Sequence, residues 1–286
     1  MKDVLIRFWK PPDLPDLRDI FTASFGDPPE IVASFHRIFL TGPEVCMLAA
    51  VPEEGRPEGR PVAAVYCLPG PELRTRSHRI SSVYLYAFGC LPEWRGQGIT
   101  KQVYTAAFRE AGGRATASCL IPVSDSLMQA YNRTGCSFVP LGRTRFAKVA
   151  GDEATEAGAL PAERLSWHEY ACRREECLEP YPHAVYPDSY YSLSAEYGYA
   201  FLSLPGALAT VIPAEDRLIV SELLCPDADP ACALAGVAAV CPAEIYEVRT
   251  PAFLPGPGEL RPFAYVHTET GIITDTEEFW YPFGLE

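Results

Sequence analysis

The sequence has no continuous hydrophobic run long enough to cross a bilayer, although 48% of its 286 residues are hydrophobic. Its N-terminus carries only a short apolar patch interrupted by Arg7 and Lys10, without the apolar core and small-residue cleavage site of a secretion signal. These absences favour a water-soluble globular protein, and we expect it to be cytoplasmic.

Paired cysteine spacings are also missing. The ten cysteines include no C-x-x-C pair, and the two that lie closest together are Cys172 and Cys177. Zinc sites and disulfide frameworks in small domains show regular paired spacings. We therefore expect neither a metal site nor a disulfide framework, and we interpret most of the cysteines as small buried hydrophobic residues.

Basic residues are scarce in the second half of the chain. Residues 1–150 hold 18 Lys and Arg against 14 Asp and Glu, a net charge of +4, whereas residues 151–286 hold 6 against 23, a net charge of −17. A mildly basic half suits a polyanionic nucleotide, and a strongly acidic half repels nucleic acid and attracts cations. We expect no nucleic-acid partner, although acidic residues that only solvate a surface would show the same composition.

The first half contains an alternation of strands and helices. Spacings such as Leu17, Ile20 and Phe21 predict helices, and β-branched and aromatic runs between Gly and Pro predict strands. The predicted strands are 4–9, 45–51, 62–68, 80–89, 115–121 and 143–149, and the predicted helices are 15–25, 29–40, 101–112 and one that runs from a cap at Ser124 or Asp125 to Gly135. This order predicts an α/β fold with a mixed sheet.

The most informative segment is the loop between the strand at 80–89 and the next helix. Gly96 and Gly98 stand directly before that helix, where backbone N–H groups converge on an anion and side chains would keep phosphate oxygens away. Arg95 can add a charge-assisted hydrogen bond at the rim. The segment predicts either a phosphate-binding loop or a plain structural turn, because turns also use glycine.

A second motif supports the first of these interpretations. The segment RGQGIT, Arg95 to Thr100, fits the pattern R/Q-x-x-G-x-G/A, and Tyr131 and Gly135 fit a later Tyr-x-x-x-Gly pattern. With these two motifs in this order, the sequence resembles the GCN5-related N-acetyltransferase family.

Three positions depart from the patterns of that family. Thr100 stands where Gly or Ala is usual, Ser124 where Asn is common and Cys136 where Phe is usual. Thr100 matters most, because its branched side chain would lie beside the phosphates and either crowd them or donate its hydroxyl to them.

The resemblance implies the acyl-CoA N-acyltransferase fold for residues 1–150, with acetyl-CoA as the cofactor. The residues that it implies for cofactor binding are Gly89, Cys90, Leu91, Arg95, Gly96, Gln97, Gly98, Ile99, Thr100 and Ser124. In the family, the fourth strand bulges near its end and parts from the fifth, which frees a backbone N–H to polarise the thioester oxygen. Gly89 and Pro92 make such a break plausible within residues 88–91.

The catalytic residues that we expect are Tyr131 and Tyr84. Tyr131 matches the family's tyrosine and would give a proton to the leaving thiolate. No carboxylate stands where a general base is expected, and Glu93 fits a solvated turn. Tyr84, Tyr86 and Phe88 are expected on one face of their strand, and we interpret the first two hydroxyls as holders of a water relay. Because no His and Asp set surrounds Cys90, direct transfer in a ternary complex is favoured over a covalent intermediate.

The second half repeats the alternation in a shorter form. Residues 151–162 have the composition of a linker, and 163–286 are expected to form a smaller α/β domain similar to the first. Its predicted helices are 163–178, 188–197 and 229–240, and its predicted strands are 199–204, 207–212, 218–224, 245–250 and 262–266. Asp227 and Asp229 in place of the phosphate loop would repel a diphosphate, which indicates a degenerate copy of a tandem protein. The aromatic tail, 277–286, is expected to pack against a domain.

Two functions follow as expectations. The first is an N-acetyltransferase that moves an acetyl group from acetyl-CoA to a primary amine of a small molecule or an exposed peptide, with the acidic half attracting a cationic acceptor. The second, suggested by Thr100 and the missing base, is a non-catalytic acyl-CoA-binding regulatory or interaction protein. The phosphate loop does not touch the acyl group, so it leaves the acyl length, the acceptor and the oligomeric state open.

Overall fold

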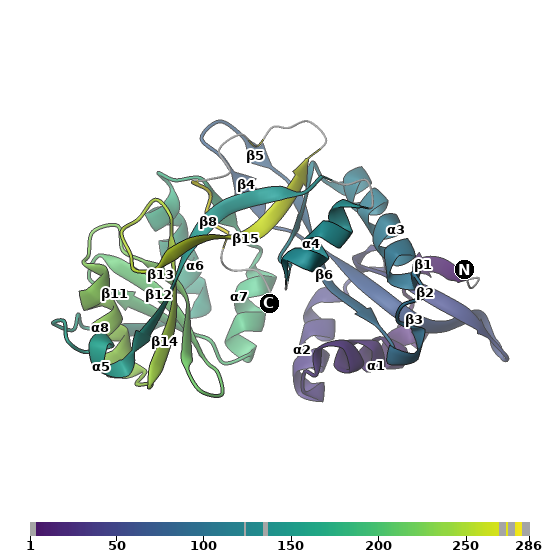
Figure 1. The fold of residues 1–286 in the computed structure, drawn as a ribbon, viewed down its shortest axis with the longest axis horizontal. Coiled ribbons are helices and arrows are strands. Elements are labelled where there is room, and N and C mark those ends of the chain that lie inside the picture. Colours follow the sequence, from purple (N-terminus) through teal and green to yellow (C-terminus); the bar gives the residue numbers. More distant parts are fainter. Residues whose placement is uncertain (1–3, 123, 134–136, 269–272, 274–277, 282–286) are drawn as a thin grey trace. The chain divides into compact units, whose positions relative to one another are not determined.

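The computed structural model describes residues 4–122, 124–133, 137–268, 273 and 278–281, and it divides into two compact units (Figure 1). Unit 1 contains the described residues of Met1–Pro71, Ile80–Phe138 and Val266–Glu269. Unit 2 contains those of Glu72–Arg79, Val139–Tyr265 and Thr270–Glu286. Each unit is described by itself below.

Unit 1 is a mixed sheet between two layers of helices. Its strands are β1 (Leu5–Phe8), β2 (Cys46–Glu53), β3 (Arg56–Pro69), β6 (Ser82–Cys90) and β7 (Ala117–Leu120). Its helices are α1 (Leu14–Phe25), α2 (Pro29–Phe39), α3 (Ile99–Arg114) and α4 (Asp125–Asn132), with short 3-10 turns at Pro11–Asp13, Pro43–Val45 and Pro92–Trp94. The strand order is β1-β2-β3-β6-β7, and β6 and β7 form its parallel pair. In Figure 1, α1 and α2 lie on one face of this sheet and α3 on the other.

The helices of unit 1 form where the apolar spacing predicts them. Leu17, Ile20 and Phe21 of α1 are buried at 3% exposure or less, as are Val32 and Phe35 of α2. This apolar stripe at helical spacing packs against the buried face of β3 and β6, and its burial is the main term that stabilises the layer.

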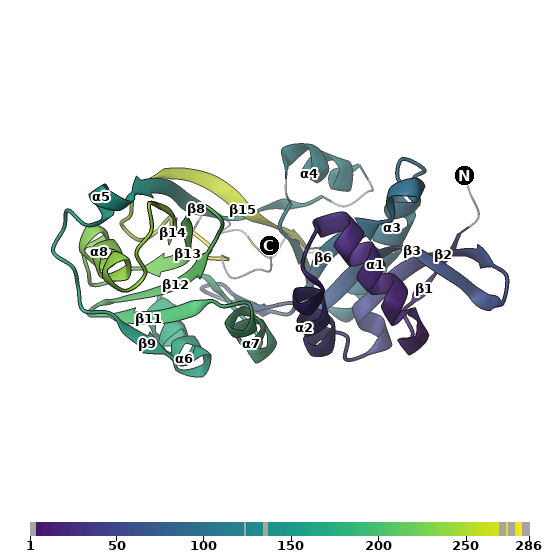
Figure 2. The ribbon, with the colours of Figure 1, turned by 90° about the horizontal axis from the view of Figure 1, so that it is seen from below.

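Unit 2 also places a sheet between helices. Its helices are α5 (Gly151–Ala154), α6 (Trp167–Leu178), α7 (Asp188–Glu196) and α8 (Pro230–Val240). Its strands are β8 (Val139–Ala150), β9 (Glu163–Leu165), β11 (Ala200–Leu204), β12 (Ala207–Pro213), β13 (Leu218–Leu224), β14 (Ile245–Pro251) and β15 (Glu259–Thr268), whose end belongs to unit 1. The strand order is β15-β8-β14-β13-β12-β11-β9, and a small separate sheet has the order β10-β4-β5 (His183–Val185, Glu72–Arg74 and Arg79–Ile80). Figure 2 shows α5 and α8 on one face of the larger sheet and α6 and α7 on the other.

The two units share one pattern of strands. In unit 1, the antiparallel strands β2, β3 and β6 are followed by α3 and by β7, which is parallel to β6. In unit 2, the antiparallel strands β11, β12 and β13 are followed by α8 and by β14, which is parallel to β13. Each pattern also contains an extra residue in its third strand, in β6 and in β13 respectively.

Several residues lie elsewhere than the sequence predicts. The strand expected at 143–149 exists as β8, but it pairs with β14 of unit 2, from Thr144 opposite Pro251 to Ala150 opposite Ile245. The segment expected to be a linker, 151–162, begins with α5, and the Leu160 N–H donates to the Cys232 carbonyl at 3.2 Å. Both segments are therefore part of unit 2 in this structure.

The aromatic tail packs as expected where it is described. Phe279, Trp280 and Tyr281 are exposed by 2% or less, and the backbone N–H of Trp280 donates to the Pro182 carbonyl at 3.0 Å. No helix among the described residues is long and apolar enough to cross a membrane.

Candidate active site

The third strand of the unit 1 pattern, β6, contains a bulge near its end. Tyr66 of β3 pairs with Tyr86, but Ala64 pairs with Gly89, so β6 has one residue more than β3 between these pairs. Ala87 lies in this bulge with a φ of 50°, which is unusual for a residue other than glycine. The parallel register of β6 with β7 runs only from Ser82 to Tyr84. The two strands therefore part just before the bulge.

The bulge lies slightly earlier than the sequence predicts. We expect the break within residues 88–91 because of Gly89 and Pro92, whereas the left-handed residue is Ala87. Gly89 serves close packing instead, because a Cβ there would lie 2.9 Å from Ile20 Cγ2 and 3.0 Å from Ser24 Oγ. A glycine is needed at position 89, but because α1 lies so close to it and not because of the backbone conformation of the bulge.

The loop after β6 leads into an uncapped helix. Gly96 and Gly98 both have a φ of 74°, and a Cβ on either would meet nothing within 4 Å. Gly98 is the N-cap of α3, it supplies no side-chain cap, and the first turn of α3 contains no acidic residue. The N–H groups of a first helical turn have no partner within the helix, so this end, with Ile99 and Thr100 at its start, suits an anion.

Arg95 holds this loop in place. Its Nε donates to the Cys90 carbonyl at 3.0 Å, and its Nη2 donates to the Ala23 carbonyl at 2.9 Å. Gln97 makes a further bond within the loop, from its side-chain amide to the Glu93 carbonyl at 3.0 Å. The sequence predicts that Arg95 bonds a phosphate at the rim, whereas in this structure it ties the loop to β6 and to α1.

Cys90 and Leu91 use their backbone N–H groups within the protein. The Cys90 N–H donates to Ser24 Oγ at 3.1 Å, and the Leu91 N–H donates to the Val62 carbonyl at 2.9 Å. Burial raises the pKa of the Cys90 thiol, and a hydrogen bond with Thr100 acts against that rise. A raised pKa keeps the Cys90 thiol protonated near neutral pH, which does not favour a nucleophilic role.

Tyr131 lies beside the end of β6. Its ring is stacked on Tyr104 of α3 at 4.9 Å between centroids and lies 5.0 Å from the ring of Phe88. Burial raises its pKa, so its hydroxyl keeps its proton in the neutral range. Ser124 caps the helix that carries it, with Ser124 Oγ accepting the Leu127 N–H at 3.3 Å. Gly135 and Cys136, the rest of the predicted motif, lie outside the described residues.

The three aromatic residues of β6 do not share one face, so that prediction is wrong for Phe88. Tyr84 is 1% exposed and stacks on Tyr86, with centroids 5.7 Å apart. The Tyr86 ring lies 5.4 Å from Phe35 of α2, whereas the Phe88 ring lies 5.2 Å from Tyr104 of α3. The extra residue at the bulge changes the phase of the strand, and so it separates Phe88 from the two tyrosines.

Sequence reasoning missed a buried pair behind these tyrosines. His36 Nε2 lies 2.6 Å from the Tyr66 hydroxyl, and the two residues are 4% and 1% exposed. Burial, with the nearby charge of Arg18, lowers the pKa of His36 to about 4. The spacing of Val32, Phe35 and His36 on the buried stripe of α2 is a signal that would have located this histidine in the core.

The equivalent helix of unit 2 is capped by a carboxylate. Asp229 Oδ1 accepts the N–H groups of Ala231 and Cys232 at 2.9 and 3.1 Å, which are the first free donors of α8. Such a cap occupies donors that a phosphate would need and adds a like charge.

In unit 2, a buried carboxylate lies just beyond the point where the parallel pairing of β13 with β14 ends. Beyond the last parallel pair, Val220 with Val248, the fully buried Glu222 accepts from Arg174 Nε at 3.0 Å. It also accepts from the Tyr170 hydroxyl and the Trp280 indole N–H, each at 2.6 Å. These donors fill the space around Glu222 with protein groups.

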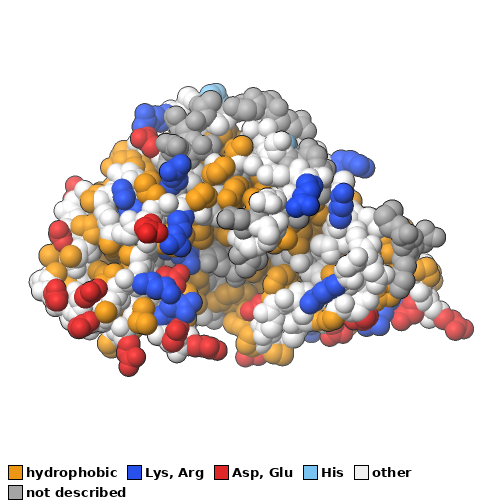
Figure 3. Space-filling model, viewed as in Figure 1, with side chains coloured by type: hydrophobic (Ala, Val, Ile, Leu, Met, Phe, Trp, Pro, Cys, Tyr) orange, Lys and Arg blue, Asp and Glu red, His pale blue; other side chains and the backbone are white. Residues whose placement is uncertain are grey.

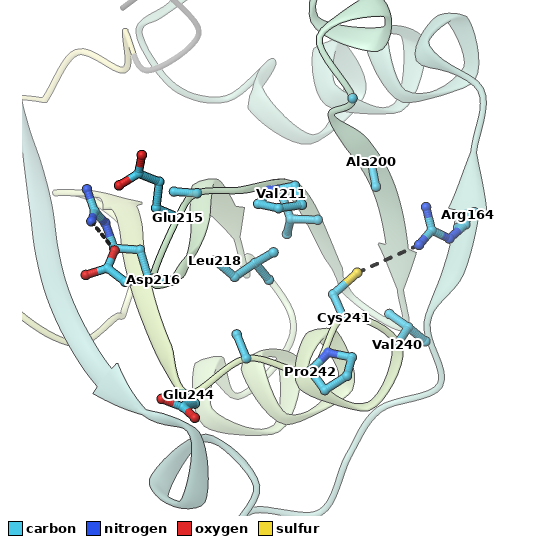
Figure 4. Close-up of a pocket in the computed structure, with 15 residues that line it drawn as sticks. Arg164, Ala200, Val211, Glu215, Asp216, Leu218, Val240, Cys241, Pro242 and Glu244 are labelled. Carbon is cyan, nitrogen blue, oxygen red and sulfur yellow. Dashed lines mark hydrogen bonds and ion pairs between the residues drawn. The ribbon is translucent and has the colours of Figure 1, made fainter.

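A separate cavity of about 620 Å³ lies at the other end of β13, by the C-terminal end of α8. Figure 4 shows Glu215 and Asp216 on one side of it and Arg164 directed toward Cys241 on the other. Arg217 is already paired with Asp216 at 2.6 Å and with Glu247 at 3.0 Å. More acidic side chains of unit 2 lie on the surface, and Figure 3 shows them mainly along the left and lower edges of the view. All the residues that line this cavity belong to unit 2, so the cavity is distinct from the start of α3 in unit 1.

Comparisons with known proteins agree with this architecture. No family model matches the chain, and no curated protein is significantly similar to it in sequence. Among solved structures, a GCN5-related N-acetyltransferase from Kribbella flavida is similar, with a TM-score of 0.67, 15% identity and coverage of 93% of this chain and 71% of that one. One from Anabaena variabilis ATCC 29413 has a TM-score of 0.67, 12% identity and coverage of 92% and 72%.

A third similar structure is Eis1 from Mycobacterium abscessus, with a TM-score of 0.64, 13% identity and coverage of 93% of this chain and 73% of that one. These likenesses extend over both units, and at such low identity they concern the fold. The chain has the fold of the GCN5-related N-acetyltransferases.

Proposed function

We propose that unit 1 binds acetyl-CoA and transfers its acetyl group to a primary amine, by direct transfer in a ternary complex. One observation carries this proposal: the parting of β6 from β7, the Tyr131 ring and the uncapped glycine end of α3 all lie along the second half of β6 and the loop that follows it. An opening between strands suits an extended arm, and the helix end suits the diphosphate at the other end of that arm.

The loop residues divide into donors and supports. Gly96 and Gly98 leave room for phosphate oxygens, and the first N–H groups of α3 are the donors. Arg95 and Gln97 hold the loop through backbone carbonyls. The positive charge of Arg95 still favours a diphosphate, although its bonds make it a positioning residue.

The oxyanion donor is assigned to the bulge. Because the N–H groups of Cys90 and Leu91 are already bonded to Ser24 and Val62, we propose that the donor toward the opening comes from residues 87–89. A backbone N–H aimed at a developing oxyanion is worth about 3 to 4 kcal/mol.

Tyr131 assists the departure of the thiolate. Because its pKa lies above that of a free phenol, it is a weaker acid than usual. We expect its main effect to be a hydrogen bond to the departing sulfur, with proton transfer completed when the site opens to water. Tyr84 is fully buried, so any water relay would pass through the partly exposed Tyr86 rather than through Tyr84 directly.

Unit 2 is proposed to be a copy of the same pattern without a cofactor. The Asp229 cap and the filled surroundings of Glu222 support this reading. Its acidic surface would attract a cationic acceptor.

The test uses the full chain. Isothermal calorimetry with coenzyme A should show one site per chain, and thiol release from acetyl-CoA should be measured with tyramine, spermidine and an unblocked tetrapeptide as acceptors. Binding together with amine-dependent thiol release supports the proposal. Binding without thiol release for any amine would favour the non-catalytic acyl-CoA-binding protein, and no heat with coenzyme A would reject both.

A further inference from the structure

The His36 and Tyr66 pair joins α2 to the centre of the unit 1 sheet. His36 Nε2 lies 2.6 Å from the Tyr66 hydroxyl, and their rings are stacked with centroids 5.7 Å apart. Such a short bond between two buried groups is strong because water does not compete with it. The pair therefore fixes the position of α2 over β3.

The pair is uncharged near neutral pH. The pKa of His36 is lowered to about 4 by burial and by Arg18 of α1, and burial raises the pKa of Tyr66 well above its usual value. The other titratable groups that act on Tyr66 are Cys46 of β2 and Tyr86 of β6, and both are neutral there. No charge has to be accommodated in this part of the core.

One polar hydrogen of the pair is not used in the bond between His36 and Tyr66. A neutral imidazole carries one N–H and a tyrosine one O–H, and only one of these hydrogens lies in the bond between them. If Tyr66 donates, the other hydrogen is on His36 Nδ1, which is buried without a partner among the described residues. If His36 donates, the Tyr66 O–H is left over. Buried donors are almost always bonded, so an ordered water or a ligand group is expected beside the pair.

The pair stands directly behind the residue that precedes the bulge. Tyr66 and Tyr86 are cross-strand partners, and the Phe21 ring lies 6.0, 5.9 and 6.3 Å from the rings of His36, Tyr66 and Tyr86. Tyr86 and the α1 and α2 helices occupy the sheet face opposite the one on which Phe88 meets Tyr104 and Tyr131. In the proposed transfer the leaving sulfur lies beside Tyr131, so the Tyr86 face is the side that is left for the amine.

We infer that His36 and Tyr66 are a positioning pair for the amine side of the proposed transfer. Their bond holds Tyr86 and the α2 helix against the bulge, and the spare donor binds a water at the buried end of the aromatic cluster. This inference rests on the proposed function. It assigns the pair no contact with the acetyl group and no role in cofactor binding.

The test separates turnover from cofactor binding. Tyr66→Phe removes the bond while it keeps the ring, and we expect kcat for the best amine of the panel to fall about tenfold with KM for acetyl-CoA within about twofold. His36→Leu should behave alike, whereas His36→Gln, which can still bond Tyr66, should keep most of the activity. Tyr170→Phe in unit 2 is the matched control, since it removes a buried bonded hydroxyl far along the chain and should leave kcat per folded molecule unchanged.

A second measurement does not depend on turnover. The ¹⁵N NMR spectrum of the labelled chain, with the His36 signals assigned by their loss in His36→Gln, should show a neutral imidazole from pH 8 down to pH 6. The inference is overturned if wild-type protein is active but Tyr66→Phe and His36→Leu lower only the melting temperature, or if they raise KM for acetyl-CoA instead of lowering kcat. If the wild-type chain itself releases no thiol with any amine, the proposed function fails, and the inference fails with it.

Discussion

Arg95 and Cys90 are joined by a hydrogen bond of 3.0 Å from the guanidinium Nε to the backbone carbonyl, across the loop that leads from β6 into α3. A second bond from the same guanidinium reaches the carbonyl of Ala23 in α1. The loop conformation thus depends on one side chain that the sequence pattern alone would assign to the ligand.

Replacing Arg95 should loosen the loop. Arg95→Ala removes both bonds and a positive charge, and we expect the Kd for coenzyme A, measured by calorimetry, to rise about tenfold or more. Arg109→Ala is the control, because Arg109 is an exposed cation of α3, the helix that this loop enters. Equal effects of the two substitutions would show that net charge matters and the loop bonds do not.

The left-handed backbone of Gly98 should matter for both stability and coenzyme A binding. An alanine there would keep open space around its Cβ but would hold a φ of 74°, which costs about 1 to 2 kcal/mol. Gly98→Ala should therefore lower the free energy of unfolding by that amount and weaken coenzyme A binding. Gly113→Ala, within the same helix and with no neighbour within 4 Å, should instead stabilise the protein by up to about 1 kcal/mol. Chemical denaturation of both variants checks the contrast.

Removing the Tyr131 hydroxyl should affect turnover rather than binding. Tyr131→Phe keeps the stacking on Tyr104, so coenzyme A affinity should change little while kcat falls by about 10²-fold. Since the pKa of Tyr131 is raised, the wild-type rate should show no alkaline loss from this group below about pH 10. A full rate in Tyr131→Phe would remove the residue from the mechanism.

The buried carboxylate of unit 2 should be critical for stability. Glu222→Gln removes the nearest counter-charge of the fully buried Arg174 and leaves the more distant Glu175 carboxylate at 3.9 Å, which costs about 3 to 5 kcal/mol. Glu278→Gln is the comparison, since the pair of Glu278 with Arg76 is exposed and its loss should cost less than about 1 kcal/mol. A small effect of Glu222→Gln in urea unfolding would contradict the importance of this network.

Acid should destabilise the protein through His36. The folded pKa of His36 is about 4, below the unfolded value of about 6.5, so the unfolded chain binds more protons between these values. Stability should fall as the pH drops from about 6.5 to 4, by at most about 3 kcal/mol from this group. His36→Gln should flatten the stability curve in that window, and an unchanged slope would mean that His36 titrates in the folded state as it does in the unfolded chain.

Backbone conformation and helix starts were predictable where neighbouring residues determine them. The positive φ of Gly96 and Gly98, the start of α3 and the Ser124 cap follow from residues within one turn of each other. The left-handed Ala87 was not predictable, because nothing in an alanine indicates that conformation and its cause is the register of β3 against β6.

Residue order was enough to establish the alternation of strands and helices, the glycine entry to α3 and the acidic residues that stand before α8, since each depends on short-range spacing and backbone geometry. Only the packed chain could decide that β8 pairs with β14, that Arg95 bonds carbonyls and that His36 meets Tyr66. Two of these contacts join residues 30 or more positions apart, and the Arg95 bonds depend on which of several carbonyls lies within reach. The burial of whole faces, rather than any local preference, determines them.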